Sequence, residues 1–148
     1  MFLDNSISDV VCKMRIIYST SNWNLWREVL YENNYIKCES KKNWNTAKLL
    51  KSATEGAIST GAEVEYIDLY DLSFTGCRSC MLCKRKGVER CHCYWKDHLS
   101  PIIDKVFSAD TLLIGTAIYL GRPTSQYFAF MERLHFSVLS YDDYNNYF

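Results

Sequence analysis

The stretch TLLIGTAI, residues 111–118, decides the fold class of this 148-residue chain. Its residues are nearly all apolar, which is typical of a central parallel strand that helices cover on both faces. Pro123 follows and suits the start of a helix. The buried stripe of that helix is expected to comprise Tyr127, Phe130, Met131 and Leu134. A buried strand followed by an amphipathic helix indicates an α/β domain.

Upstream of this strand the same alternation continues. Residues 97–107 predict a helix that Asp97 caps, with Pro101 tolerated near the first turn. Residues 63–69 predict a strand, and the apolar spacing of residues 45–60 predicts a helix that ends before Gly61. Alternating strands and helices imply right-handed βαβ units, an open parallel sheet with helices on both faces, and a ligand site at the carboxyl ends of the strands.

The two ends of the chain give weaker signals. Residues 10–19 (VVCKMRIIYS) form a β-branched run that predicts a strand. Residues 20–38 are rich in aromatic side chains and show no clear period, although residues 35–38 fit a short strand. The tail, residues 141–148, carries no helix or strand signal. We expect one domain, residues 1–148, that lacks the later strands of a complete doubly wound sheet.

Composition narrows the function class. Seventeen basic residues balance seventeen acidic residues, so nothing indicates binding to nucleic acid or to an anionic membrane. No apolar run approaches the roughly 20 residues of a membrane span, and the first residues lack a signal peptide's pattern. We therefore expect a cytoplasmic protein. Seven cysteines in that compartment more often serve metal or redox chemistry than structural disulfides.

Two segments could bind a phosphorylated ligand. The first, KKNWNTAKLL at residues 41–50, feeds a helix N-terminus, where free backbone N–H groups and the helix dipole attract phosphate. Lys41, Asn45 and Thr46 would add side-chain contacts, although Asn45 and Thr46 would equally serve as plain helix caps. The second segment, residues 116–134, carries a Tyr119-Leu120-Gly121 turn between a strand and a helix containing Glu132-Arg133.

Together these segments resemble the flavodoxin-like, NAD(P)H-dependent FMN reductases. That family has a Gly-Ser-Pro-Arg lead ending in Asn-Thr, and a Pro-x-Tyr-x-Gly turn before a helix that ends in Asp-Arg. In this chain Ala117 replaces the proline and Glu132 the aspartate. The resemblance implies a flavodoxin-like fold, FMN as cofactor, and a turn that lies against the flavin ring. The residues of that turn are Ala117, Ile118, Tyr119, Leu120 and Gly121.

A third segment is the cysteine-rich loop, residues 77–93. Cys77, Cys80, Cys83 and Cys91 follow a spacing that can present four thiolates to an iron–sulfur cluster, and the loop resembles that of the family's iron–sulfur flavoproteins. Zinc is another possible metal, with His92 or Cys93 as alternative ligands. From the strand and helix on either side, we expect the loop to lie over the ligand end of the sheet, where basic neighbours would lower thiol pKa values. Cys12 and Cys38 are interpreted as core residues.

The resemblance covers residues 41–134 well and residues 1–40 loosely. Cys38-Glu39-Ser40 replaces the glycine-led lead, and Glu39 places a negative charge where a phosphate would approach. The chain is therefore interpreted as a divergent or shortened member of the family.

The function expected from this resemblance is electron transfer from NAD(P)H through FMN to an unknown acceptor. The cofactor would do the chemistry, so no catalytic side chain is predicted. FMN is expected rather than FAD because no Gly-x-Gly-x-x-Gly motif occurs. Aromatic content of 15% and the family's habit of covering flavin with a neighbouring chain predict a homodimer or larger oligomer. The alternatives are a non-catalytic metal-binding or redox-sensing module, and a fragment that needs a partner chain to complete its sheet.

Overall fold

Three parallel strands form the main sheet of the protein. The computed structural model describes residues 32–85 and 87–139, so the strand predicted at residues 10–19 and the tail at residues 141–148 lie outside the described residues. Strand β1 (Glu32–Cys38) lies in the middle, between β2 (Glu63–Asp68) and β3 (Thr111–Thr116), in the order β2-β1-β3. The fold is an open parallel α/β sheet, as predicted.

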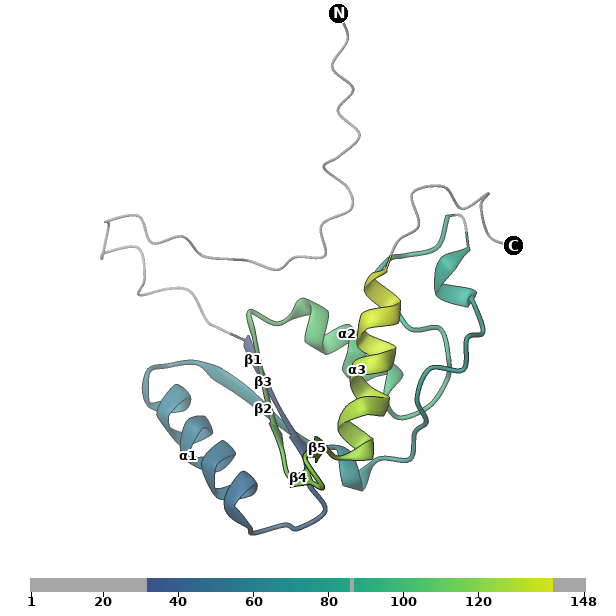
Figure 1. The fold of residues 1–148 in the computed structure, drawn as a ribbon. Coiled ribbons are helices and arrows are strands. Elements are labelled where there is room, and N and C mark those ends of the chain that lie inside the picture. The colour runs from purple at the N-terminus through teal and green to yellow at the C-terminus, as the bar shows by residue number, and fades with distance from the viewer. Residues whose placement is uncertain (1–31, 86, 140–148) are drawn as a thin grey trace, which may run out of the picture.

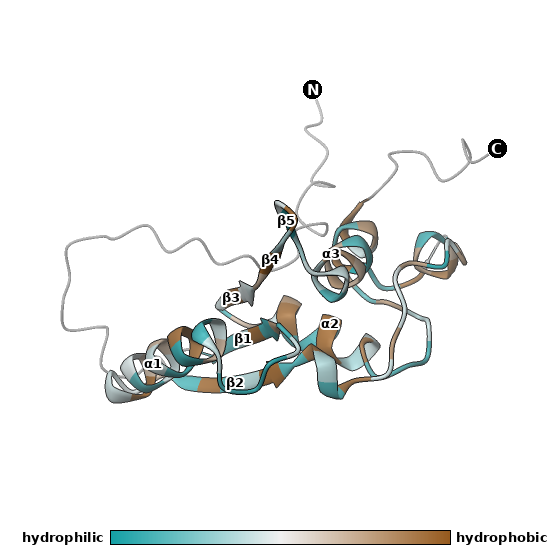
Figure 2. Ribbon diagram, turned by 60° about the horizontal axis from the view of Figure 1, so that its bottom comes forward, coloured by the Kyte–Doolittle hydropathy of each residue, from teal (hydrophilic) through white to brown (hydrophobic). Residues whose placement is uncertain are grey.

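Helices cover both faces of this sheet (Figure 1). Helix α1 (Asn45–Ser59) packs on one face, whereas α2 (Ser100–Ser108) and α3 (Ser125–Val138) pack on the other. The main hydrophobic core lies between the sheet and α2 and α3, and the hydrophobic segments of α2 are brown in Figure 2. Its most buried members are Ile36, Cys38, Leu69, Leu99, Ile103 and Phe130.

Strand β1 is the central strand, although its sequence ENNYIKC contains four polar or charged residues. Six of its seven residues are buried. Asn34 donates a hydrogen bond from Nδ2 to the Lys105 carbonyl of α2 at 2.9 Å, and the Asn33 amide reaches the Glu63 carbonyl. Because each polar group has a partner, burial is tolerated. Only residues 35–38 were predicted as a strand here.

Most of the predicted elements are confirmed. The helix predicted over residues 45–60 is α1, the strand predicted over residues 63–69 is β2 with one 3-10 turn, η2 (Leu69–Asp71), after it, and the helix predicted over residues 97–107 is α2. The N-cap of α2 is Leu99 rather than Asp97, but Asp97 Oδ1 accepts from the backbone N–H groups of Leu99 and Ser100 at 3.0 and 3.2 Å, at the start of the helix.

Two predictions need correction. Pro123 does not start a helix: it belongs to β5 (Arg122–Pro123), which pairs with β4 (Ile118–Tyr119) in a short hairpin. Helix α3 begins at Ser125 because the Thr124 hydroxyl accepts from the Tyr127 N–H at 3.3 Å. Strand β3 is not central among the described strands, since β1 alone pairs with it, and it ends at Thr116 rather than residue 118.

No helix in the described part of the chain has the length and hydropathy needed to cross a bilayer.

Close contact between α1 and β3 depends on Gly115. A Cβ atom there would lie 2.7 Å from Leu50 Cδ1 and 2.8 Å from Thr46 Cγ2, so α1 would have to move away. We predict that Gly115→Ala lowers the free energy of unfolding by about 1–3 kcal/mol, measured by urea denaturation. Gly56→Ala is the control, because no atom lies within 4 Å of its Cβ position and alanine favours a helix interior. Equal effects of the two variants would contradict this packing.

Candidate functional site

The loop between β1 and α1 offers an uncapped helix N-terminus. No side-chain hydrogen bond caps α1 at Trp44, and its first turn contains no acidic residue. The first backbone N–H groups of a helix have no partner within the helix, and the dipole places partial positive charge there. These groups lie at the carboxyl ends of β1 and β3, where open α/β sheets bind ligands.

The side chain of Lys37 holds this loop through hydrogen bonds to its backbone. It is almost fully buried on the α1 face of β1, and its Nζ donates to the backbone carbonyl of Glu39 and, at 3.3 Å, to that of Lys41. The same Nζ pairs with Asp68 Oδ2 at 2.9 Å. Burial would raise the pKa of Asp68, but hydrogen bonds from Lys37 and from the exposed Lys42 bring it below its ordinary value. The ammonium group of Lys37 therefore connects β1 with β2 and with the loop between β1 and α1.

A depression of about 450 Å³ lies on the surface between this loop, the start of α1 and the segment that follows β3. It is lined by Glu39, Asn43, Trp44, Asn45, Thr46, Lys48, Ala117 and Tyr119. Four of the predicted flavin-contacting residues, Asn45, Thr46, Ala117 and Tyr119, thus share one surface. Lys41 is not among the lining residues, because its Nζ lies over the Trp44 ring, 5.3 Å from the centroid. Sequence analysis missed Lys48, one helical turn after Asn45 on α1.

The β4–β5 hairpin forms one edge of the depression. Its two turn residues, Leu120 and Gly121, both have positive φ angles, 51° and 76°. Positive φ at both central positions is the requirement of the tight hairpin turns that match strand twist, so glycine suits position 121 for its backbone conformation. No described protein atom lies within 4 Å of the Cβ position of Gly121, so this side of the turn is open. The side chains of Ile118 and Leu120 are exposed.

The lining residues suit the terminal phosphate of FMN in all but one respect. Backbone N–H groups, a hydroxyl, an amide and an ammonium meet at the start of α1, and the turn residues stand beside them. The exception is Glu39, whose side chain is 97% buried in the same surface. Among the residues that the structure describes, its Oε2 has no hydrogen-bond partner. The site therefore combines donors for an anion with one buried carboxylate.

A second site surrounds the cysteine loop. Cys77, Cys80, Cys83 and Cys93 are free thiols, and all four line one small pocket of about 20 Å³ beside α3. Three of the four predicted metal ligands, Cys77, Cys80 and Cys83, therefore line the same pocket. The fourth sulfur at the pocket is that of Cys93, whereas Cys91 is in a disulfide and does not line the pocket. His92, the alternative zinc ligand, pairs through Nδ1 with Asp104 at 2.6 Å.

Arg133 of α3 holds this loop in place, and sequence analysis assigned it no role. Its side chain is 98% buried, with Nη2 donating to Cys93 Sγ at 3.0 Å and to Ser100 Oγ at 2.8 Å. Nη1 pairs with Asp97 at 2.5 Å and donates to the Thr75 carbonyl. The available signal was an arginine three residues after Phe130, on the buried stripe of α3.

Two further contacts fix the loop against the same helix. Glu132 Oε2 accepts from the Cys77 N–H at 2.9 Å, and a Cβ atom on Gly76 would lie 2.4 Å from that oxygen. The buried Lys84 donates from Nζ to the Phe136 and Leu139 carbonyls at the C-terminal end of α3. Glu132 and Arg133, the pair that carries the family resemblance, therefore position the cysteines.

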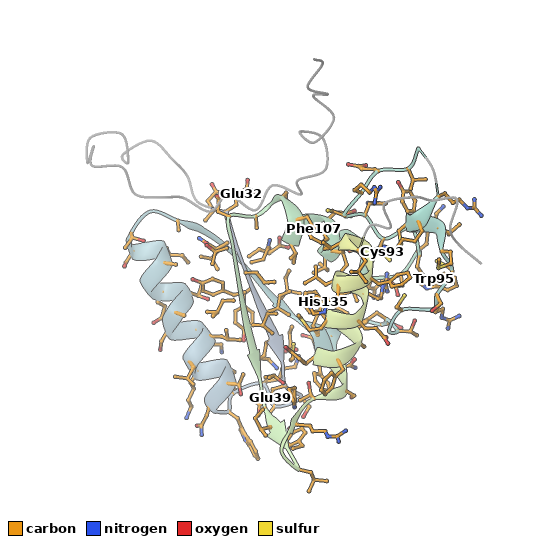
Figure 3. All side chains as sticks on the ribbon, turned by 45° about the horizontal axis from the view of Figure 1, so that its top comes forward. Glu32, Glu39, Cys93, Trp95, Phe107 and His135 are labelled. Atoms are coloured by element: carbon orange, nitrogen blue, oxygen red, sulfur yellow. The ribbon has the colours of Figure 1, made fainter. Side chains whose placement is uncertain are left out.

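The cysteine pocket does not lie over the ligand end of the sheet, and that prediction is wrong. Thr124 caps the start of α3, and its hydroxyl donates to the Cys38 carbonyl at 2.8 Å, but the pocket meets α3 at Arg133 and beyond. The separation is about 14 Å along a helix that rises about 1.5 Å per residue. Figure 3 shows Cys93 and Trp95 well away from Glu39. The loop leaves β2 at the ligand end but then follows α3.

Burial dominates the thiol chemistry. It raises the pKa of Cys83, which Lys84 opposes and the neighbouring thiols of Cys93, Cys80 and Cys77 raise further. The expectation that basic neighbours lower the thiol pKa values thus fails at Cys83. Burial likewise raises the pKa of Cys38 to about 12, which agrees with its interpretation as a core residue.

The four thiols have the donor chemistry of an iron–sulfur site but not its geometry. Within residues 32–85 and 87–139, no three His, Cys, Asp or Glu side chains are placed so that they could hold a metal ion. A pocket of about 20 Å³ has room for about one water molecule. The thiols would have to rearrange around a cluster.

The fold defines an open parallel α/β protein with a candidate anion site at the start of α1, and comparison with known proteins identifies its family. The family model of NADPH-dependent FMN reductases matches residues 35–147. The chain therefore belongs to this family.

Curated relatives include two archaeal iron–sulfur flavoproteins. That of Methanocaldococcus jannaschii is 30% identical over 89 residues, which cover 60% of this chain and 44% of the relative. That of Archaeoglobus fulgidus is 32% identical over 80 residues, which cover 54% of this chain and 37% of the relative. The chain thus spans less than half the length of either relative. No solved structure gave a significant match.

The position of Lys37 generates a stability prediction. We expect Lys37→Met to lower the free energy of unfolding by about 3 kcal/mol, because it leaves Asp68 poorly compensated and frees two loop carbonyls. Lys42→Met removes the exposed partner of the same carboxylate and should have a much smaller effect. Urea denaturation of both variants measures the difference. A similar loss in the two would show that the buried ammonium does not organise the loop.

Proposed function

We propose that this protein is a flavin-dependent oxidoreductase that binds FMN and transfers electrons from NAD(P)H to an acceptor still to be identified. The observation that carries the proposal is the depression at the uncapped N-terminus of α1, at the carboxyl ends of β1 and β3. Membership in the NADPH-dependent FMN reductase family supports it. A cytoplasmic location is part of the same proposal.

Each part of the depression has a role in this proposal. Thr46, Asn45 and Lys48, with the first N–H groups of α1, hold the phosphate, and the turn from Ala117 to Gly121 lies against the ring. The flavin supplies the hydride chemistry when bound. The protein positions it, and no side-chain acid or base is assigned to the reaction.

Thr46 gives the sharpest test of the phosphate site. We predict that Thr46→Val weakens FMN binding about 10-fold or more, the usual loss of a hydrogen bond to a charged group, and leaves riboflavin binding unchanged. Quenching of flavin fluorescence measures both affinities. Thr60→Val, at the opposite end of α1, should bind FMN like the unmodified protein. Loss of riboflavin binding in Thr46→Val would indicate general damage rather than a phosphate contact.

Activity is tested separately. With FMN bound, NADH or NADPH should bleach the oxidised flavin spectrum under anaerobic conditions. A folded protein that binds neither FMN nor riboflavin would favour the alternative of a non-catalytic module.

We further propose that the protein forms a homodimer or larger oligomer through the hairpin side of the depression. Ile118, Tyr119 and Leu120 are exposed there beside the lining residues, and an apolar edge next to a ligand favours a covering partner. Light scattering of the FMN-bound protein should give a multiple of the monomer mass, and Leu120→Asp should shift it toward the monomer. A monomeric mass with flavin bound would contradict this proposal.

A specific observation also supports iron binding by the cysteine loop. Four free thiols line one pocket, and both relatives are named iron–sulfur flavoproteins. We propose that Cys77, Cys80 and Cys83 provide three sulfurs of a 4Fe–4S site. The fourth comes from Cys93 by position, or from Cys91 by spacing after a thiol reductant has opened the disulfide of Cys91.

Serine variants separate these possibilities. After anaerobic reconstitution, Cys80→Ser should lose iron and broad visible absorbance while retaining FMN. Comparison of Cys91→Ser with Cys93→Ser then identifies the fourth ligand, since only the ligand variant should lose iron. If the unmodified protein retains no iron after reconstitution, the proposed cluster is contradicted and the flavin proposal is unaffected.

A further inference from the structure

Glu39 is the one residue of the depression that contradicts simple phosphate binding. It directly follows β1, its side chain is 3% exposed, and its Oε2 is a buried acceptor without a partner. Leaving a buried polar group unpaired is costly, and a charged group costs more. Glu39 lines the same surface as Asn45, Thr46 and Lys48, so a ligand in that surface can supply the missing hydrogen bond once the covered Oε2 turns toward it.

No lysine in the described ranges 32–85 and 87–139 forms a hydrogen bond or ion pair with the Glu39 carboxylate. The ammonium group of Lys37 contacts the backbone carbonyls of Glu39 and Lys41 and pairs with Asp68. Lys42 pairs with Asp68 and Asp71. The uncapped N–H groups of α1 are hydrogen-bond donors, whereas an ionised carboxylate only accepts.

The N–H groups of α1 need an acceptor, and the Glu39 carboxylate needs a donor. A ligand that satisfies both must carry negative oxygens and an acidic proton. A phosphate monoester meets this requirement, because its second pKa is about 6 and its monoanion keeps one hydroxyl. Sulfate has no such proton near neutral pH. Hydrogen bonds between an O–H donor and a charged oxygen are also among the strongest in proteins.

We propose that Glu39 determines the specificity of the phosphate site by accepting a hydrogen bond from the protonated phosphate of the flavin. The site therefore binds the hydrogen phosphate monoester in preference to an unprotonated anion. The inference rests on the proposed function and adds the protonation state of the ligand. No covalent bond changes: one proton is shared between Glu39 and a phosphate oxygen.

This arrangement makes binding depend on pH. The complex holds one proton more than the free protein plus dianionic FMN, so affinity should fall about tenfold for each pH unit above about pH 6. The titratable groups around Glu39 are Lys37, Lys41, Lys42, Lys48, Tyr66, Asp68 and Tyr119. Burial raises the pKa of Tyr66, and hydrogen bonds outweigh burial to lower that of Asp68. Neither shift brings a group into the range of the phosphate.

The experiment measures FMN and riboflavin affinities by fluorescence quenching between about pH 5.5 and about pH 8.5, the range around the phosphate pKa. The unmodified protein should lose FMN affinity as the pH rises, whereas riboflavin binding stays constant. In Glu39→Gln the amide donates to the phosphate dianion, so FMN binding should tighten at high pH and lose its pH dependence. Glu55→Gln, an exposed position on α1, is the matched control and should keep the dependence. Sulfate should compete with FMN in Glu39→Gln but not in the unmodified protein.

The outcomes are distinct. FMN affinity of the unmodified protein that does not change with pH, or the same slope in Glu39→Gln and Glu55→Gln, overturns the role of Glu39. The same slope for riboflavin also overturns it, because riboflavin has no phosphate. The first result needs no variant, so a misfolded Glu39→Gln protein leaves the test decisive. Loss of both flavins in the unmodified protein instead overturns the proposed function.

Discussion

The buried ammonium group of Lys37 is the interaction on which the ligand end of this fold depends. Its charge lies in the α1 face of the central strand, where it pairs with Asp68 of β2 and binds two carbonyls of the following loop. A buried charge is tolerated only with such a full set of partners. Meeting that requirement fixes the path of residues 39–44 and leaves the N-terminus of α1 open at the sheet edge.

Helix α3 connects the two candidate sites. At its start, the Thr124 hydroxyl caps the helix and binds the Cys38 carbonyl at the end of β1. In its second half, Arg133 and Glu132 hold the cysteine loop through Cys93, Asp97 and the Cys77 N–H. One rigid element thus sets the distance between the depression and the thiol pocket. Any chemistry that couples the two sites has to cross this distance.

The spacing of apolar residues along the sequence was sufficient to predict most helices and strands. It failed where contacts between distant segments determine the structure. The periodic apolar residues of α1, α2 and α3 predicted all three helices, and β2 and β3 followed from their alternation and apolar run. Strand β1 was only half recognised, because Asn33, Asn34 and Lys37 give it a polar sequence. Their partners come from Lys105, Glu63 and Asp68, far along the chain, and no local window contains them.

The sequence by itself determined the α/β class, the family, the loop before α1 and the cysteine motif, because each depends on residue type and spacing within a short segment. Tertiary structure alone decided that Cys93 joins Cys77, Cys80 and Cys83, and that their pocket lies along α3. It also decided that Glu39 is buried without a partner for Oε2. The physical reason is that burial and pairing are set by groups from distant segments, which meet only when the sheet and its helices pack.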